Sequence, residues 1–272
     1  LGYNYFKVFI GEDILLKDIH EELIEDFIEY LKINTDMKDT FINSRLRAVR
    51  RFLYFYMDRN YLTNYKISLL RVQNKQKRPY TDEELEKLLE KPDMDKGIFS
   101  EYRNWVIVNF LLGTGVRLNT LSQLKVEDIS LENAIVDLRH TKNRKQRIIP
   151  LSKSLVNLLF EYLDIRQGDK EDNLFCTIHG KKLQTSSIKS AIYRYNKRRG
   201  VETTFIHKFM HTFAKKWILN GGDAFRLQKI LGHSSMKMVR EYVNMYDEDL
   251  KENFNDFNPL EEFNDGGEYI DM

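Results

Sequence analysis

The stretch LLGTGVRLNTLSQLKVEDI, residues 111–129, decides how the larger part of this chain is interpreted. The apolar run WVIVNFLLGTG leads into it and ends at two glycines separated by one residue, which is typical of a tight turn between packed helices. Two glycines alone do not form a nucleotide-binding loop, which requires a longer glycine-rich pattern. Arg117 follows the turn directly, so we take it as a candidate functional residue on a helical scaffold.

The patterns around this turn predict one mostly helical domain, which we place at residues 80–246. Its first helix is marked by TDEE, in which Thr81 is a suitable N-cap and Glu84 follows three residues later, as in a capping box. Two short β-rich stretches, NAIVDLRH and RKQRIIPLS, flank the polar turn TKNRK and predict a hairpin. Helical patterns resume at Lys153 and continue to about Asn244. We therefore predict a mostly α domain with a small antiparallel β-sheet.

Residues 1–72 predict a separate helical unit. The segments DIHEELIEDFIEYLKIN and TFINSRLRAVRRFLYFYMDRNYL both carry apolar residues at helical spacing. The polar face of the second segment presents a row of arginines, which either faces solvent or lies along nucleic-acid phosphates. These arginines are Arg45, Arg47, Arg50 and Arg51. The polar, basic residues 73–79 are expected to link the two units, and the whole fold is predicted to be mainly α.

Composition identifies the class of protein less clearly than the distribution of charge does. The 272 residues are 42% apolar and 31% charged, which is enough for a proper core, and the net charge of +2 is too small to identify a partner. However, residues 181–200 carry only basic charges, whereas residues 247–272 are acidic apart from Lys251. This asymmetry indicates a body that binds a polyanion and a tail that a polyanion repels.

The lone cysteine and the apolar runs indicate the compartment. Cys176 has no second cysteine to pair with, which excludes an internal disulfide and fits a reducing compartment. The longest apolar run is far shorter than the roughly 20 residues of a membrane span, and no signal peptide is found. We therefore expect no membrane association. Because the chain begins at Leu1 rather than at Met, we expect a fragment, which leaves a preceding segment open.

Two histidines in IHKFMHTFA, residues 206–214, invite a metal-site interpretation. His207 and His211 are four residues apart, so they lie on one face of a helix. A zinc protease would have Glu where this chain has Lys208, and no cysteine pair or carboxylate cluster supplies further ligands. We therefore predict no metal.

A set of residues spread over the larger domain indicates different chemistry. In chain order the set consists of Arg117, Lys142 on the hairpin, His207, His233 and Tyr242. The segments GTGVRLNTLSQLKVEDI, HTFA and LGHSSMKMVREYVNMY resemble the tyrosine recombinase (phage integrase) family, in particular mobile-element integrases and Xer-type recombinases. The segment TFINSRLRAVRRFLYFYMDRNYL resembles the family's core-binding helical domain, so the resemblance extends over residues 1–246.

The chemistry of DNA strand exchange fits these residue types. Rejoining DNA without a cofactor requires a covalent intermediate, which a tyrosine can form with the scissile phosphate. A phenol has a pKa of about 10, so at neutral pH another group must take its proton. The resemblance implies that Tyr242 is the nucleophile, with Tyr246 as the competing tyrosine four residues later. It further implies that Arg117 grips the phosphate and that Lys142 protonates the leaving 5′ oxygen.

The two histidines of the set also receive roles from the resemblance. His207 is expected to assist proton transfer and His233 to hydrogen-bond the phosphate, and His211 is expected to support this arrangement. Cleavage is expected without metal ion, nucleotide or other cofactor. The family's motif His-x-x-Arg-His has a second phosphate-binding arginine at a position where this chain has Met210. Because methionine offers neither charge nor donor, loss of that arginine is expected to slow cleavage by about 10²–10³.

Three explanations for Met210 stay open. The residue is an engineered or recent change, a natural change in a chain that only binds DNA, or a tolerated change with another cation in place of the arginine. We favour the first, because the other five residues of the set are intact. The alternatives to a site-specific recombinase or integrase are a catalytically inactive DNA-binding member of the family and, less well supported, a type IB topoisomerase.

The expected partner is double-stranded DNA at recombination sites. Contacts with phosphates should come from both units, which are expected to close round the duplex, and they carry little sequence information. Tyr193 and Tyr195 either pack on sugars or anchor their helix in the core. The residues expected to contact DNA are Arg50, Arg51, Lys145, Lys189, Arg194, Lys197, Arg198 and Arg199.

The resemblance also implies assembly on DNA. It predicts a homotetramer in the synapse, an accessory DNA-bending protein, and action at the nucleoid of the bacterial cytoplasm. Residues 247–272, with apolar Phe254, Phe257, Leu260 and Phe263 among acids, either dock on a neighbouring protomer or form a disordered, solubilising tail.

Overall fold

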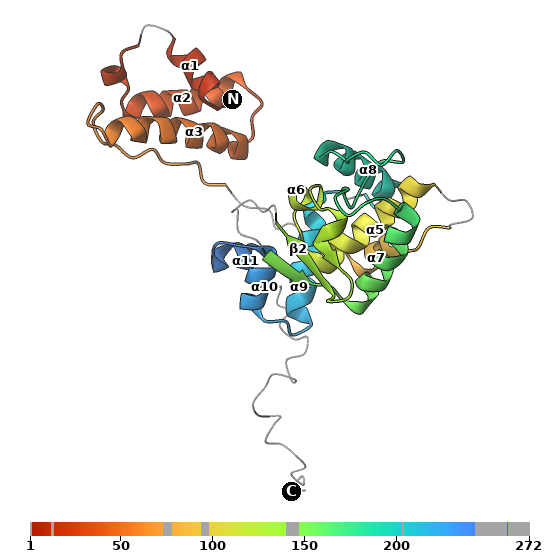
Figure 1. Cartoon of the computed structure of the whole chain (residues 1–272). Coiled ribbons are helices and arrows are strands. Elements are labelled where there is room, and N and C mark those ends of the chain that lie inside the picture. The colour runs from red at the N-terminus through yellow and green to blue at the C-terminus, as the bar shows by residue number, and fades with distance from the viewer. Residues whose placement is uncertain are drawn as a thin grey trace, which may run out of the picture. The chain divides into compact units, whose positions relative to one another are not determined.

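The computed structural model describes residues 2–11, 14–72, 78–93, 98–139, 147–202, 204–242 and 260. The chain divides into two compact units, Leu1–Lys75 and Gln76–Met272, each considered by itself below. Both are built mainly from helices, and the second also contains a small antiparallel sheet (Figure 1). The predicted fold class is therefore confirmed.

The first unit is a small helical bundle. It comprises helices α1 (Gly2–Ile10), α2 (Glu21–Asn34) and α3 (Asp39–Met57), with a 3₁₀ turn, η1 (Leu16–Asp18), between the first two. The buried residues of α3 recur at helical spacing and pack against α1 and α2. They include Ile42, Leu46, Val49 and Leu53, which are all fully buried.

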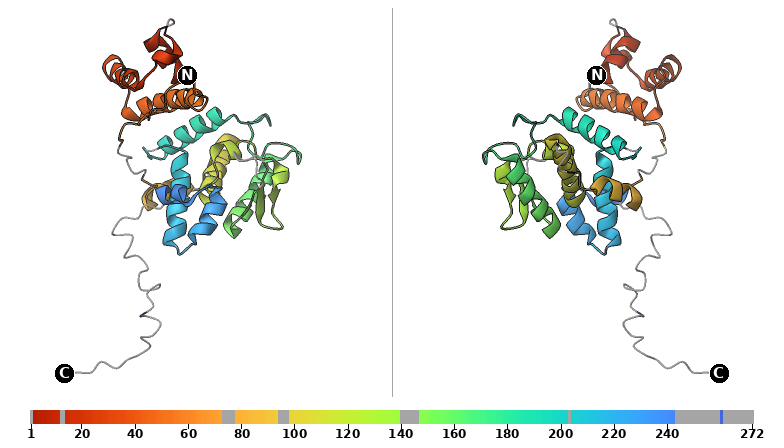
Figure 2. Two further views of the ribbon diagram at one scale, coloured as in Figure 1. Left: turned by 90° about the vertical axis from the view of Figure 1, so that its left-hand side faces the viewer. Right: turned by 90° about the vertical axis from the view of Figure 1, so that its right-hand side faces the viewer.

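The second unit is organised around helix α5 (Phe99–Thr114), which is buried on almost every side. Four helices pack against it, namely α4 (Asp82–Leu89), α7 (Lys153–Arg166), α8 (Thr185–Arg198) and α9 (His207–Leu219). Figure 2 shows α5 between α9 on one side and α7 on the other. The apolar run that precedes the two glycines in the sequence is thus the central helix of the core.

Helix α4 begins as the sequence predicts and is joined to α9. Thr81 Oγ1 accepts a hydrogen bond from Glu84 N (3.2 Å), and Glu84 Oε2 accepts one from Thr81 N (3.1 Å), which completes the capping box. The buried Tyr80 donates its backbone N–H to Thr212 Oγ1 (2.9 Å) on α9. The start of the second unit is therefore fixed to the helix that carries the paired histidines.

A three-stranded antiparallel sheet contains the predicted hairpin. Strands β2 (Ile135–Leu138) and β3 (Arg147–Pro150) pair with Leu138 opposite Arg147. A two-residue strand, β1 (Ile129–Ser130), adds to β2 and was not predicted. It follows the short helix α6 (Leu118–Leu121) and the 3₁₀ turn η2 (Val126–Asp128).

The second unit ends in helices α10 (Ala224–Leu231) and α11 (Met236–Tyr242). They pack with α9 around a second, smaller apolar cluster that includes Met210, Leu231 and Val239. Residues 73–77 of the predicted linker 73–79 lie outside the described residues, as does the acidic tail 247–272 apart from Leu260. Within the described parts of the chain, no helix has the length and apolar character that crossing a membrane requires.

Candidate active site

Arg117 is held by the close packing of the turn that precedes it. Gly115 ends α5 with φ 62°, and a Cβ at this position would lie 2.6 Å from Phe213 Cδ1 and 2.7 Å from Leu231 Cδ2. Only glycine fits, both for the left-handed backbone and for the contact with α9 and α10. Arg117 Nη1 donates a hydrogen bond to the carbonyl oxygen of Leu231 (2.9 Å). The arginine is thus directed to the C-terminal end of α10.

His233 projects from the turn that ends α10. Gly232 has φ 62°, and the N–H groups of Gly232 and His233 donate to the carbonyls of Lys229 (3.2 Å) and Gln228 (3.1 Å). These two bonds form a Schellman motif, which stops the helix at a defined residue. The His233 side chain is consequently buried, with 6% exposure for the residue. The structure brings Arg117 and His233 together at one turn.

A third basic residue, Arg147, lies at the same turn and was not singled out from the sequence. A Cβ built on Gly232 would overlap the Arg147 guanidinium, lying 2.8 Å from its Cζ. Arg147 is half-buried at the start of β3, two residues before the buried Ile149 and next to the exposed Ile148. Strand alternation alone places Arg147 on the inner face with Ile149, and this signal was available in the sequence.

The three groups influence one another electrostatically. Burial, with the charges of Arg117 and Arg147, lowers the pKa of His233 from 6.5 to about 4. Burial and the Arg117 charge lower the pKa of Arg147 from its usual range to about 10. At neutral pH both guanidiniums are therefore charged and the imidazole is neutral. An arrangement of this kind favours an anion, which would relieve the repulsion between the two cations.

Met210 lies beside this turn but does not contribute a polar group to it. It is 4% exposed and packs in the apolar cluster with Leu231, whose carbonyl oxygen holds Arg117. Lys208 points elsewhere, because its Nζ lies 2.9 Å from Glu84 Oε2 and 4.2 Å from the centre of the Tyr80 ring. Lys208 is therefore engaged with α4 and does not replace the expected arginine.

The two histidines on α9 differ in burial. His207 is the first residue of the helix and is exposed, whereas His211 is 7% exposed. His207 precedes Met210 by about one turn. Among the residues that the structure describes, no group of three or more His, Cys, Asp or Glu side chains is arranged to hold a metal ion.

The side chains of three further candidates lie outside the described parts of the chain. Lys142 and Lys145 belong to residues 140–146, which lie outside the described parts of the chain. The backbone of Tyr242 ends α11, and its side chain is likewise outside the description. The roles of Lys142, Lys145 and Tyr242 therefore stay predictions.

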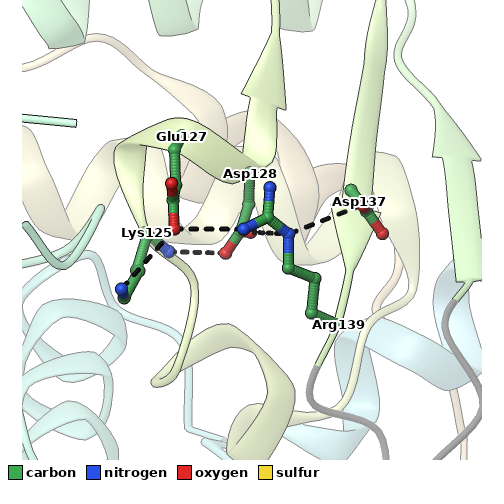
Figure 3. Close-up of polar contacts among 5 residues, drawn as sticks. All are labelled: Lys125, Glu127, Asp128, Asp137 and Arg139. Atoms are coloured by element: carbon green, nitrogen blue, oxygen red, sulfur yellow. Dashed lines mark hydrogen bonds and ion pairs between the residues drawn. The ribbon is translucent and has the colours of Figure 1, made fainter. Parts of the chain in front are cut away.

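The network at the base of the hairpin fixes the sheet beside residues 140–146 (Figure 3). Arg139 Nη1 lies 3.1 Å from Glu127 Oε1, and Arg139 Nε lies 3.1 Å from Asp128 Oδ1 and 3.6 Å from Asp137 Oδ2. Asp128 Oδ2 also accepts a hydrogen bond from the backbone N–H of Lys125 (2.8 Å). The end of β2 is thereby tied to η2.

The basic residues of α8 divide into exposed and internally paired groups. Lys189 and Arg194 are exposed, whereas Lys197 pairs with Glu202. Arg198 and Arg199 both pair with Glu101 of α5. These pairings favour a structural role for Lys197, Arg198 and Arg199, and the DNA contacts of the basic residues stay predictions.

The tyrosines of α8 also divide. Tyr195 is fully buried and donates its hydroxyl proton to the Leu88 carbonyl (2.8 Å), and the Arg199 guanidinium lies over its ring at 3.7 Å. Tyr193 is 50% exposed. Of the two tyrosines, Tyr195 is the one that anchors the helix in the core.

In the first unit, Arg50 is half-buried and Arg51 is exposed on α3.

Comparison with known proteins assigns the family. The model of the phage integrase family matches residues 79–249, which is more than half of the chain. This chain therefore belongs to the phage integrase family of tyrosine recombinases. The matched region contains all the helices and strands that build the turn around Arg117 and His233.

Two relatives of this chain are tyrosine recombinases of staphylococci. The chain is 30% identical over 183 residues to tyrosine recombinase XerD of Staphylococcus haemolyticus (strain JCSC1435), covering 65% of this chain and 61% of that protein. It is 27% identical over 256 residues to tyrosine recombinase XerC of Staphylococcus carnosus (strain TM300), covering 90% and 84%. The chain thus spans about three fifths of the first relative's length.

A solved structure extends the likeness to both units. The chain is similar to the site-specific recombinase XerH bound to a palindromic difH substrate in a post-cleavage complex. The TM-score is 0.73 at 26% identity, and the alignment covers 94% of this chain and 77% of that chain. The likeness supports the mainly helical fold with its small sheet.

Proposed function

We propose that this chain is a site-specific DNA recombinase or integrase. The observation that carries the proposal is the convergence of Arg117 and His233 on the turn Leu231–His233, in a chain of the phage integrase family. A guanidinium and an imidazole at a buried turn form a binding place for a phosphate diester. The XerH neighbour, which is a recombinase bound to its DNA substrate, adds support.

In the proposed reaction, DNA is cleaved and rejoined through a 3′-phosphotyrosyl intermediate. The Tyr242 oxygen bonds to the scissile phosphorus as the bond from phosphorus to the 5′ oxygen breaks. His207 assists removal of the phenol proton, and Lys142 gives a proton to the leaving 5′ oxygen. Arg117 and His233 stabilise the negative charge that develops on the nonbridging oxygens. The second strand-joining step reverses these bond changes, so no metal ion or nucleotide is consumed.

Met210 is proposed to reduce the rate of this reaction. It stands where the family has an arginine, and its buried thioether offers no charge to the phosphorane. The same observation favours a second candidate function, that of a DNA-binding protein which does not cleave. The two functions differ in one property, since the second predicts no covalent product even after arginine is restored at position 210.

The proposed partners follow from the same chemistry and family. They are duplex DNA at recombination sites, further copies of the chain in a tetrameric synapse, and an accessory DNA-bending protein. Residues 251–272 are proposed to dock on a neighbouring protomer, so their deletion should weaken assembly on DNA. If assembly is unchanged, the tail is only a solubilising segment.

A nicked suicide substrate tests the proposed function. A duplex that the purified chain selects from a random-sequence library is nicked near the cut, so that a short fragment diffuses away and the covalent protein–DNA product accumulates. We expect a product that forms in EDTA, is absent in Tyr242→Phe and persists in Tyr246→Phe. A product that survives Tyr242→Phe, or that requires Mg²⁺, would contradict the mechanism. Relaxation of supercoils without sequence preference would instead favour a topoisomerase.

A further inference from the structure

Three basic side chains lie at one turn of the backbone, residues 231–233. Arg117 donates to the carbonyl oxygen of Leu231 (2.9 Å), the Arg147 guanidinium lies against Gly232, and His233 is the next residue. Arg117 is the residue before α6, Arg147 begins β3, and His233 follows the end of α10. The Schellman motif and the left-handed φ of Gly232 fix this backbone, so the three groups converge on a rigid platform.

Arg147 is built into this place without an anionic partner among the described residues. No described carboxylate lies within ion-pair distance of it, and its Nε is buried without a hydrogen-bond acceptor in that part of the chain. By contrast, Arg139, Arg198 and Arg199 each pair with a carboxylate. A buried guanidinium without a counter-charge is costly, and a second guanidinium beside it adds repulsion. Such an arrangement is stabilised when an external anion enters.

We propose, resting on the proposed recombinase function, that Arg147 is a catalytic residue that supplies the second guanidinium contact to the scissile phosphate. Met210 and Leu231 belong to one apolar cluster, and the Arg147 guanidinium lies against Gly232, so both α9 and β3 contribute residues near this turn. The charge that α9 lacks is thus provided from the sheet.

The geometry of the guanidinium suits this role. As the Tyr242 oxygen attacks, the phosphorus becomes pentavalent and its nonbridging oxygens gain negative charge. Arg117 already uses one Nη1 hydrogen bond on Leu231, which fixes its orientation and leaves other donors for the phosphate. Arg147 adds a second planar fork on a neighbouring residue of the same turn. The repulsion between the two arginines, which lowers the pKa of Arg147 together with burial, is then replaced by attraction to the shared anion.

A double-mutant cycle tests whether Arg147 replaces the arginine absent at position 210. The single-turnover rate of covalent product on the nicked duplex is measured for the unmodified chain, Arg147→Gln, Met210→Arg and the double variant. We expect Arg147→Gln to slow the reaction on the order of 10²–10³ in the Met210 chain. After Met210→Arg, the same change should slow it by less than about 10-fold. A small loss in both backgrounds, or an equally large loss in both, would overturn the proposal.

Two further comparisons separate phosphate contact from a structural effect. Arg147→Lys keeps the charge but not the fork, so its rate should fall between those of the unmodified chain and Arg147→Gln. A methylphosphonate at the cut removes one negative charge from the substrate, so the loss caused by Arg147→Gln should shrink. A loss that is the same on both substrates indicates a structural role and contradicts the proposal. Arg226→Gln, which changes an exposed arginine on α10, serves as the control for the loss of an arginine elsewhere in the second unit.

The outcomes also distinguish this inference from the proposed function. If no background, including Met210→Arg, yields a product that depends on Tyr242, the proposed function fails and this inference fails with it. If the product forms and depends on Tyr242 but not on Arg147, only the inference fails. DNA-binding affinity and thermal unfolding of each variant confirm that the compared proteins are folded.

Discussion

Arg139 and Arg147 lie at the same end of the small sheet, one just beyond β2 and the other at the start of β3, yet their surroundings are opposite. Arg139 is surrounded by carboxylates of Glu127, Asp128 and Asp137 at 3.1–3.6 Å. Arg147 has the Arg117 charge and a neutral His233 as neighbours. Arg139 is more exposed, but its charge is balanced by the protein.

The contrast between Arg139 and Arg147 distinguishes an arginine that stabilises a fold from an arginine that binds a ligand. Where the guanidinium braces two backbone segments, the chain provides the anion itself, as at η2 and β2. Where the described chain supplies only further positive charge, the balancing anion must come from outside. Arg117 and Arg147 therefore belong to the second kind, and the predictions below test this division.

The largest expected effect concerns Arg117. We expect Arg117→Gln to slow formation of the covalent product on the order of 10²–10³ or more, because a charged donor to the phosphorane is lost. The measurement is the single-turnover rate on the nicked duplex, with Arg226→Gln as the matched control. If Arg117→Gln and Arg226→Gln react at rates within a few-fold of each other, Arg117 is not a phosphate ligand.

The next effect concerns the pH dependence of stability through His233. In the folded chain the pKa of His233 is lowered to about 4, so between pH 6.5 and 4 the unfolded chain binds the proton and the folded chain does not. The free energy of unfolding should therefore fall by about 3 kcal/mol as pH drops through this window. Urea unfolding at several pH values measures it.

A matched variant makes the pH prediction specific. His233→Gln should remove most of that decline, whereas His179→Gln, which changes an exposed histidine in the same unit, should leave it in place. A decline that is identical in His233→Gln would mean that other groups cause the acid sensitivity. The contrast between the Arg139 network and the turn around His233 would then not be explained by the charges of Arg117 and Arg147.

A smaller effect distinguishes the two arginines by stability. Arg139→Gln leaves the Asp128 carboxylate, whose side chain is 3% exposed, without its cation. Because Arg139 itself is 45% exposed, we expect a loss of only about 1–2 kcal/mol in the free energy of unfolding. Arg147→Gln should cost less, since it removes repulsion with Arg117. If urea unfolding shows a larger loss of stability for Arg147→Gln than for Arg139→Gln, the distinction between the structural Arg139 and the ligand-binding Arg147 is wrong.

The smallest effect is a shift in one titration. Removing the positive charge of Arg147 should raise the pKa of His233, because that charge helps to hold it down. Arg139→Gln should leave the same titration unchanged. Both are measured by NMR of the imidazole protons. No difference between the two variants would place Arg147 too far from His233 to share an anion with it.

Much of the fold was predictable because it depends on local patterns. The capping box at Thr81, the β2–β3 hairpin and the helical spacing of α3 need only nearby residues. Strand β1 was missed because a pair of residues, Ile129 and Ser130, carries no alternation to detect. The fold class therefore followed from the sequence, while the full sheet did not.

The candidate site was predictable only where a motif marks it. Arg117 and His233 stand in segments that resemble the family, whereas Arg147 stands in a short strand with no distinctive motif. Its position depends on strand pairing and on the bare backbone of Gly232, and a single sequence does not show that these distant residues meet. The pairing of Arg199 with Glu101 was hidden for the same reason.

The hydrogen bond from Tyr80 to Thr212 has a mechanical consequence. Residues 78–80 lie near the start of the second unit, and Tyr80 is joined to α9 by this bond. The ion pair between Glu84 and Lys208 joins α4 to α9 about one helix turn further on. The start of the second unit is therefore fixed to α9, the helix that begins at His207. His207, the residue proposed to move a proton, thus lies on a helix whose position depends on the first residues of the second unit.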